Sequence, residues 1–416
     1  MKKLAIKAFT TQSDHTQDIS LSYEHFGLPL NQAPVVLVNH ALTGNSNVAG
    51  EDGWWSALIG PEKCIDTNRY AVLAFNIPGN GYDGFVIDAY KQFVAKDMAQ
   101  LFLLGLEKLG ISKLYAIIGG SLGGGIAWEM AALNPAITSH LIPVASDWKS
   151  TDWLIANCQI QEQFLLNSKQ PVHDARMHAM LCYRTPESFN QRFNRSTNEA
   201  LQVFNVESWL THHGEKLQSR FQLSAYKLVN QLLRSIDITK NGPEAFRKLQ
   251  ESDTHIHIIG VDSDLFFTAS ENKETFKQLA QSQSNVTYGE ITSVHGHDAF
   301  LLEFEQLEVL LAGIFKPQAA AAKVQVLKFG GTSLANGEGL SKVIEIVGAK
   351  KAAQQPIALV VSARDNATDQ LERLLALASQ GQDYHPALDF FKAQQTTPLK
   401  EPILAHDFEQ LSQILA

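Results

Sequence analysis

Strongly apolar runs of strand length recur along the first three quarters of the chain, and helical patterns separate them. Apolar residues fill most positions of the first four runs, which is typical of strands buried on both faces of a parallel sheet. The runs are residues 34–40, 70–76, 114–118, 141–145, 255–260 and 286–288. The helical patterns cover residues 90–109, 125–133 and 299–314. This alternation predicts an α/β fold built on a parallel, doubly wound sheet.

A polar, helix-like segment interrupts the alternation between about residues 150 and 250. Aromatic side chains such as Trp153, Phe164 and Trp209 are spaced through it. Helices inserted between two strands of such a sheet would lie over one of its edges. We therefore expect a helical cap over the carboxyl edge of the sheet, within a first domain that spans residues 1–315.

A low-complexity stretch over residues 316–323, which contains four consecutive alanines, predicts a linker. Strand-like patterns return at residues 324–333 and 357–362, with a helical pattern between them. Residues 324–416 are therefore predicted to form a second and smaller α/β segment, and their pattern contains no obvious closing element.

Composition narrows the classes of function. The chain has 416 residues, of which 45% are hydrophobic and 19% charged, and these proportions are typical of a soluble globular protein. A formal net charge of −9 argues against nucleic-acid binding. No apolar run approaches the length of a membrane span, and no signal peptide is evident. Because Cys64, Cys158 and Cys182 lack disulfide or zinc spacing, we expect no metal and a cytoplasmic location.

The stretch from Gly119 to Gly124 joins an apolar strand pattern to a helical one, and Ser121 lies at its centre. It has the G-x-S-x-G spacing of a nucleophile elbow, in which small residues allow a sharp turn that exposes the serine hydroxyl near a helix N-terminus. The alternative is a glycine-rich turn with an idle serine. The strand–turn–helix context favours Ser121 as a nucleophile.

A serine nucleophile needs a base, and a carboxylate must orient that base. In this architecture the acid and the histidine follow the serine in that order, each after a later strand. Asp262 and Asp264 follow the strand pattern that ends at residue 260, while His295 and His297 follow the next one. Position alone leaves the choice open within each pair.

The tetrahedral intermediate of acyl transfer also needs backbone N–H donors directed at its oxyanion. One donor is expected at Leu122, directly after the serine. The other is expected at Leu42, in the loop that follows the first buried strand. The alternative for this loop is an ordinary connection between a strand and the next element.

Several longer motifs resemble the homoserine O-acyltransferases of methionine biosynthesis, which have the α/β-hydrolase fold. The similarity extends over roughly residues 15 to 315. The motifs lie at residues 39–45, 54–61, 65–70, 119–124, 175–177, 183–185, 214–216, 263–264 and 296–301. The resemblance implies an α/β-hydrolase fold with an inserted helical cap. It also favours Asp264 over Asp262, and His297 over His295.

The resemblance implies an acetyl transfer in two steps. Ser121 would take an acetyl group from acetyl-CoA, and the hydroxyl of L-homoserine would then attack the acyl-enzyme with His297 as the base. Arg176 would bind the carboxylate of the amino acid, Asp298 its ammonium, and Tyr183 would line the pocket. In the alternative reading, Arg176 is a solvated helix residue and Asp298 caps a helix.

Acetyl-CoA would be a co-substrate, so no bound cofactor is expected, and a homodimer through the helical cap is expected. Other members of the same fold class remain open at this stage. These are a serine esterase, which Pro78-Gly79-Asn80-Gly81 favours slightly, an O-succinyltransferase and a serine acetyltransferase.

The segment after the linker resembles the N-terminal part of an aspartate kinase. The motifs are residues 328–333 and 360–364, with Thr368-Asp369. By this resemblance Lys328, Gly330, Gly331 and Ser333 would face ATP phosphates, because a cation and backbone N–H groups suit polyanions. Alternatively, the glycine turn is a structural hairpin. Fewer than a hundred residues remain, so we expect either part of a bifunctional fusion or a non-catalytic remnant.

Overall fold

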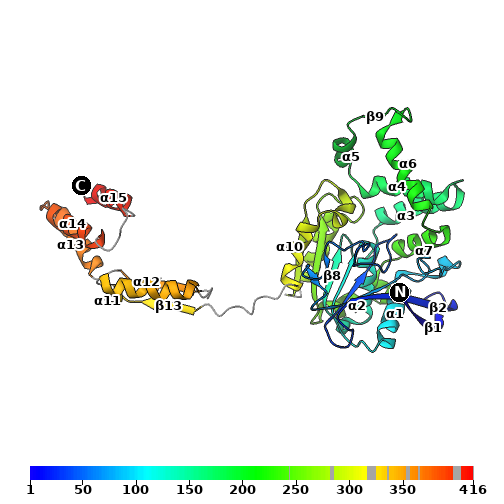
Figure 1. Cartoon of the computed structure of the whole chain (residues 1–416), viewed down its shortest axis with the longest axis horizontal. Coiled ribbons are helices and arrows are strands. Elements are labelled where there is room, and N and C mark those ends of the chain that lie inside the picture. The colour runs from blue at the N-terminus through cyan, green and yellow to red at the C-terminus, as the bar shows by residue number, and fades with distance from the viewer. Residues whose placement is uncertain are drawn as a thin grey trace. The chain divides into compact units, whose positions relative to one another are not determined.

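The computed structural model describes residues 1–242, 244–281, 285–315, 325–334, 337–352, 357–363, 366–396 and 404–415. The chain divides into two compact units, Met1–Lys316 and Pro317–Ala416, which run from blue to yellow and from orange to red in Figure 1. The predicted linker, residues 316–323, lies outside the described residues. Among the helices described, none is long and apolar enough to cross a membrane.

The first unit is built on an eight-stranded sheet. Its strands, in spatial order, are β1 (Lys2–Thr10), β2 (Thr16–Gly27), β6 (Ala71–Phe75), β3 (Val35–Asn39), β7 (Leu114–Gly120), β8 (Thr138–Val144), β11 (His255–Val261) and β12 (Val286–Ile291). From β6 to β12 all neighbouring strands are parallel. The predicted parallel sheet also has an antiparallel edge that the sequence pattern did not indicate, because β2 pairs antiparallel with both β1 and β6.

The central strands are covered on both faces. In β3, Leu37 belongs to one hydrophobic cluster, whereas Val36 and Val38 belong to the other. This alternation follows from the two-residue period of a strand. The first cluster includes residues of α1 (Ala95–Lys108), α2 (Leu122–Leu133) and α9 (Ala269–Ala280), and the second includes residues of α10 (Phe304–Phe315). The core therefore has the three layers of an α/β fold.

Two predicted helices differ from the structure at their starts. The pattern over residues 90–109 divides into a 3₁₀ turn, Tyr90–Gln92, and the helix α1. The pattern over residues 299–314 divides into a 3₁₀ segment, Gly296–Leu301, and the helix α10. In both places a continuous apolar pattern does not reveal a break in the backbone hydrogen bonding.

Five helices form the cap over the sheet, and Figure 1 shows them in green at one end of the first unit. They are α3 (Asp152–Asn167), α4 (Pro171–Tyr183), α5 (Pro186–Phe193), α6 (Asn205–Gln218) and α7 (Leu223–Arg234). A short pair of strands, β9 (Thr197–Asn198) and β10 (Val203–Phe204), lies between α5 and α6. The next helix, α8 (Glu244–Gln250), packs against α2 of the core.

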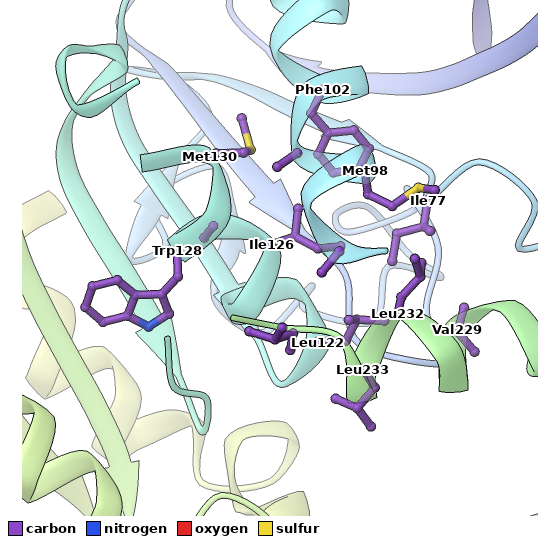
Figure 2. Packing of buried hydrophobic residues seen from close by; sticks show 14 of the residues in the cluster. Ile77, Met98, Phe102, Leu122, Ile126, Trp128, Met130, Val229, Leu232 and Leu233 are labelled. Atoms are coloured by element: carbon purple, nitrogen blue, oxygen red, sulfur yellow. The ribbon is translucent and has the colours of Figure 1, made fainter. Parts of the chain in front are cut away.

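The cap is joined to the core by an apolar contact next to the serine turn. Figure 2 shows Leu122 and Ile126 of α2 in the same cluster as Val229, Leu232 and Leu233 of α7. Of these, Leu122 directly follows Ser121 and is fully buried. Because apolar burial stabilises by about 25 cal/mol per Å², this contact holds α7 firmly over the turn.

The second unit has a two-stranded parallel sheet and several helices. Strand β13 (Gln325–Phe329) pairs with β14 (Ile357–Val361). The described helices are α11 (Gly331–Leu334), α12 (Gly337–Ala352), α13 (Ala367–Ser379), α14 (His385–Thr396) and α15 (Ala405–Leu415). A small core forms where α13, α14 and α15 meet, around Leu374, Leu388 and Phe391.

The end of α10 is bound by side chains of the first unit itself. The carbonyl oxygen of Phe315 accepts hydrogen bonds from Arg69 Nη1 at 3.3 Å and from Tyr70 Oη at 3.1 Å. The Tyr115 hydroxyl donates to the carbonyl oxygen of Ile314. These donors satisfy carbonyl groups that a helix C-terminus leaves without a partner in the helix.

A chain that ends after Pro317 should therefore keep the first unit folded. We expect its thermal unfolding midpoint to lie within about 2 °C of the corresponding transition of the full chain, because no core contact of α10 is removed. Differential scanning calorimetry of both chains measures this directly. A large loss of stability would show that the first unit depends on the second.

Candidate active site

Ser121 lies in a strained turn between β7 and α2. Its backbone has φ 55° and ψ −125°, a conformation that residues with a side chain rarely adopt and that costs about 1–3 kcal/mol. Hydrogen bonds keep the turn in place: Ser121 N–H donates to Val144 O at 2.9 Å, and Ser121 O accepts from the N–H groups of Gly124 and Gly125. The predicted nucleophile elbow is therefore present in its expected geometry.

Two glycines allow the turn to sit close to the sheet. A Cβ on Gly123 would lie 2.3 Å from the carbonyl oxygen of Asn39, and one on Gly119 would lie 2.4 Å from Gly123. Real Cβ atoms do not approach a backbone atom this closely, so the motif needs glycine here for space. The helix α2 can then begin directly after the serine.

The structure brings Ser121, Asp264 and His297 together. Ser121 Oγ lies 2.8 Å from His297 Nε2, and His297 Nδ1 lies 2.7 Å from Asp264 Oδ2. When His297 Nδ1–H donates to the carboxylate, Nε2 is free to accept the serine proton. All three side chains are buried, and they come from the ends of three parallel strands, where such sites form.

Further contacts hold the acid and the base. Asp264 Oδ1 accepts the N–H groups of Phe266 at 2.6 Å and Phe267 at 3.0 Å, which leaves Oδ2 for the histidine. The rings of Tyr183, Phe266, Phe267 and Phe300 surround the His297 imidazole, with centroids 5.2 to 5.8 Å away. This aromatic shell keeps bulk water away from the proton-transfer path, which strengthens the electrostatic interactions inside it.

The two competing residues lie elsewhere. Asp262 is exposed, and its Oδ1 accepts the N–H of Ser293 at 3.0 Å. His295 Nδ1 lies 3.0 Å from Ser188 Oγ, in the first turn of α5. Each stabilises the loop that carries His297 without taking part in the Ser121 arrangement.

The loop with Leu42 follows β3, and Leu122 is the first residue of α2. N–H groups at a helix start have no partner within the helix, so that of Leu122 is available beside Ser121. His40 shapes the loop: its Nδ1–H donates to Ala41 O at 2.8 Å, and its Nε2 accepts the N–H of Ile77 at 3.0 Å. Burial lowers the pKa of His40 to about 4, so the ring is neutral.

Arg176 and Tyr183 lie on the same face of α4. The Arg176 guanidinium is half-buried and lies 5.7 Å from the centroid of the Tyr183 ring, so Arg176 is not a fully solvated helix residue. Tyr183 is buried, and the centroid of its ring lies 5.5 Å from that of the His297 imidazole, with the two planes tilted by 40°. Of the two predicted pocket residues, Tyr183 therefore contacts His297, and Arg176 contacts Tyr183.

Asp298 makes a contact that the sequence analysis missed. Its Oδ2 accepts a hydrogen bond from Arg184 Nε at 2.9 Å, and both side chains are largely buried. His295, not Asp298, is the N-cap of the 3₁₀ segment Gly296–Leu301, so the capping alternative is wrong. Arg184 stands in the 183–185 motif, but nothing in its spacing identifies a partner 114 residues away.

The predicted phosphate-facing residues of the second unit lie around the end of β13. Lys328 is on the strand and exposed, Gly330 follows it, and Gly331 and Ser333 are in the short helix α11. Ser333 N–H donates to Gly330 O at 3.0 Å. The four residues therefore extend from the end of β13, through Gly330, into α11.

Comparisons with known families agree with both parts of the chain. The family model of the α/β hydrolase fold matches residues 34–304. The amino acid kinase family model matches residues 323–412, at the C-terminal end of the chain. The fold, the serine elbow and the Ser–His–Asp arrangement define the first unit as a serine enzyme of the α/β-hydrolase class.

Relatives make the assignment more specific. A homoserine O-acetyltransferase of Methanococcus vannielii is 33% identical over 71% of this chain and 68% of its own length. The chain belongs to the homoserine O-acetyltransferase family. The crystal structure of homoserine O-acetyltransferase from Bacillus anthracis aligns with TM-score 0.67 and 18% identity, over 76% of this chain and 97% of that one. Esterase E22 aligns with TM-score 0.68 and 19% identity, over 76% and 99%.

Substitutions within each competing pair test the arrangement. Asp264→Asn and His297→Ala should lower the turnover of an activated ester such as p-nitrophenyl acetate about a thousandfold or more, because they disable proton transfer from Ser121. Asp262→Asn and His295→Ala should stay within about tenfold of wild type, because neither residue touches the serine. The opposite ranking would refute the assignment.

Proposed function

We propose that this protein transfers an acetyl group from acetyl-CoA to the hydroxyl of L-homoserine through an acetyl-Ser121 intermediate. The single observation that carries the proposal is the buried hydrogen-bonded chain from Ser121 through His297 to Asp264, in a member of this family. A serine hydroxyl becomes a nucleophile when an oriented imidazole takes its proton.

In the first half-reaction His297 Nε2 takes the proton of Ser121 Oγ, and Oγ attacks the thioester carbonyl. The N–H groups of Leu42 and Leu122 would stabilise the oxyanion. The intermediate collapses by breaking the carbon–sulfur bond, and His297 returns the proton to the CoA thiolate. In the second half-reaction His297 takes the proton of the homoserine hydroxyl, whose oxygen attacks the acetyl-enzyme. The bond between the acyl carbon and Ser121 Oγ then breaks, and His297 returns the proton to Oγ.

The cap and the loop after β12 together supply the groups that an amino-acid acceptor needs. A zwitterion requires one fixed charge of each sign, and an arginine fork suits a carboxylate. Arg176 is half-buried beside Tyr183, while Asp298 directly follows His297. We assign the acceptor carboxylate to Arg176, the ammonium to Asp298 and one wall of the pocket to Tyr183.

The acyl donor is assigned from the family. The relatives that this chain matches at 33% and 32% identity are named homoserine O-acetyltransferases, which supports acetyl-CoA as the co-substrate.

Release of CoA from acetyl-CoA, measured with and without acceptor, tests the proposal. We expect one equivalent of CoA and a stable acetyl-enzyme without acceptor, and continuous turnover with L-homoserine. Ser121→Ala should abolish acetylation and lower turnover by about 10⁴-fold or more. Continuous CoA release without an acceptor would identify an esterase-type hydrolase instead, and a preference for L-serine would identify a serine acetyltransferase.

Arg176→Ala separates acceptor binding from the first half-reaction. The substitution should raise the KM for homoserine about ten- to a hundredfold, which is the value expected for a lost hydrogen bond to a charged group. Acetylation of Ser121, followed by mass spectrometry, should proceed at nearly the wild-type rate. If acetylation slowed as much as turnover, Arg176 would be positioning the catalytic groups instead.

We also propose a homodimer through the cap and a cytoplasmic location. Large apolar side chains are exposed on the cap helices and their connections, as an interface would require. They are Trp153, Ile160, Leu166, Leu181, Leu201 and Phe204. Cys158 and Cys182 are thiols that form no disulfide, which agrees with a reducing compartment.

For the second unit we propose a relationship to the N-terminal part of an aspartate kinase, without phosphotransfer activity of its own. Lys328, Gly330, Gly331 and Ser333 would be the remnant of a nucleotide-binding turn, which supports the relationship. The described strands of this unit, β13 and β14, make a sheet of two strands, which is marginal for an independent α/β domain.

A further inference from the structure

The cap contacts the loop that carries His297 through the α4–α5 junction, residues 184–185, and through the first turn of α5. Thr185 Oγ1 donates to the carbonyl oxygen of Val294 at 2.5 Å, and Ser188 Oγ lies 3.0 Å from His295 Nδ1. Gly296 has φ 65°, and a Cβ there would lie 3.0 Å from the carbonyl oxygen of Tyr183. The junction and the loop are thus in direct contact along several consecutive residues.

Within this contact the Arg184–Asp298 pair is the charged element. Arg184 Nε lies 2.9 Å from Asp298 Oδ2, and the two side chains are 15% and 16% exposed. Charged side chains this far out of water are stable when paired, and removal of one partner is costly. The pair therefore fixes the orientation of the Asp298 carboxylate before any substrate binds.

The contact leaves part of the carboxylate available. A carboxylate has about four lone-pair positions on two oxygens, and Arg184 Nε uses one of them on Oδ2. An ammonium group could therefore be bound by the same carboxylate without displacing the guanidinium. A carboxylate already held in one rotamer also loses less conformational entropy on binding.

We propose that Arg184 is a positioning residue that holds Asp298 for the ammonium group of the acceptor. Arg184 would thereby make the α4–α5 junction select alcohols that carry an α-amino group. This inference rests on the proposed acetyl transfer. Its particular claim is that Arg184 acts on the ammonium group of the acceptor through Asp298, and neither on the acyl donor nor on the Ser121 hydroxyl.

Two acceptors isolate this effect: L-homoserine and 4-hydroxybutanoate, which lacks only the amino group. In the full-length protein Arg184→Gln should lower kcat/KM for homoserine about ten- to a hundredfold, as expected for a lost charge-assisted hydrogen bond. The value for 4-hydroxybutanoate and the rate of Ser121 acetylation should change about twofold or less. Arg184→Lys should restore part of the loss, because it keeps the charge without the planar fork.

A double-substitution cycle tests whether Arg184 acts through Asp298. In an Asp298→Asn background, Arg184→Gln should cause no further loss with homoserine, since the carboxylate it positions is gone. The control is Arg195→Gln, because Arg195 is an exposed cap residue that lies over the Phe204 ring, and wild-type kinetics are expected. Thermal unfolding of each variant identifies any folding defect, and Arg184→Lys and Asp298→Asn remain informative if Arg184→Gln does not fold.

The outcomes distinguish this inference from the proposed function. Arg184→Gln could lower kcat/KM for both acceptors and the rate of Ser121 acetylation equally, or leave kcat/KM for homoserine unchanged. In either case Arg184 would not be a positioning residue for Asp298, although acetyl transfer would stand. A wild-type protein that does not acetylate homoserine would overturn both. The inference would be supported if Arg184→Gln lowered kcat/KM for homoserine selectively, and if this decrease were absent in the Asp298→Asn background.

Discussion

The backbone of Ser121 is the constraint on which the rest of the site depends. A serine with positive φ persists only where surrounding contacts outweigh its strain. Those contacts come from three directions: the bond to Val144 in the neighbouring strand, the first turn of α2, and the close approach of Gly123 to Asn39. The turn sets where the hydroxyl points, and His297 and Asp264 are useful only because the parallel strands bring them to that point.

Much of this could be predicted from sequence because it is local or follows chain order. The elbow is a contiguous motif, and the parallel topology places the acid and base after successive strands. Ser121, Asp264 and His297, which the structure brings together, could therefore be named among the candidates. The structure distinguishes the two carboxylates by their contacts. Asp264 is hydrogen-bonded to His297, whereas Asp262 accepts a hydrogen bond from Ser293. Spacing alone cannot make this distinction, because both carboxylates follow the same strand.

Other features depend on contacts between distant residues. Strand β1 is largely exposed, and β2 carries many polar residues, so their pattern does not indicate strands of a buried sheet. The Arg184–Asp298 pair joins a cap residue to the loop after β12, and such a pairing has no local signature. The sequence therefore predicted the fold class and the chemistry well, but not the edge of the sheet or the connections between cap and core.

The buried ring of His40 has a consequence for the behaviour of the protein in acid. Burial lowers the pKa of this imidazole to about 4, below its ordinary value of 6.5. As the pH falls below 6.5 the unfolded chain takes up a proton that the folded chain refuses, so stability declines until about pH 4. The neutral ring that joins Ala41 to Ile77 thus keeps its hydrogen bonds unchanged near neutrality. The burial of His40, in the loop beside Ser121, therefore makes the stability of the fold decrease in acid.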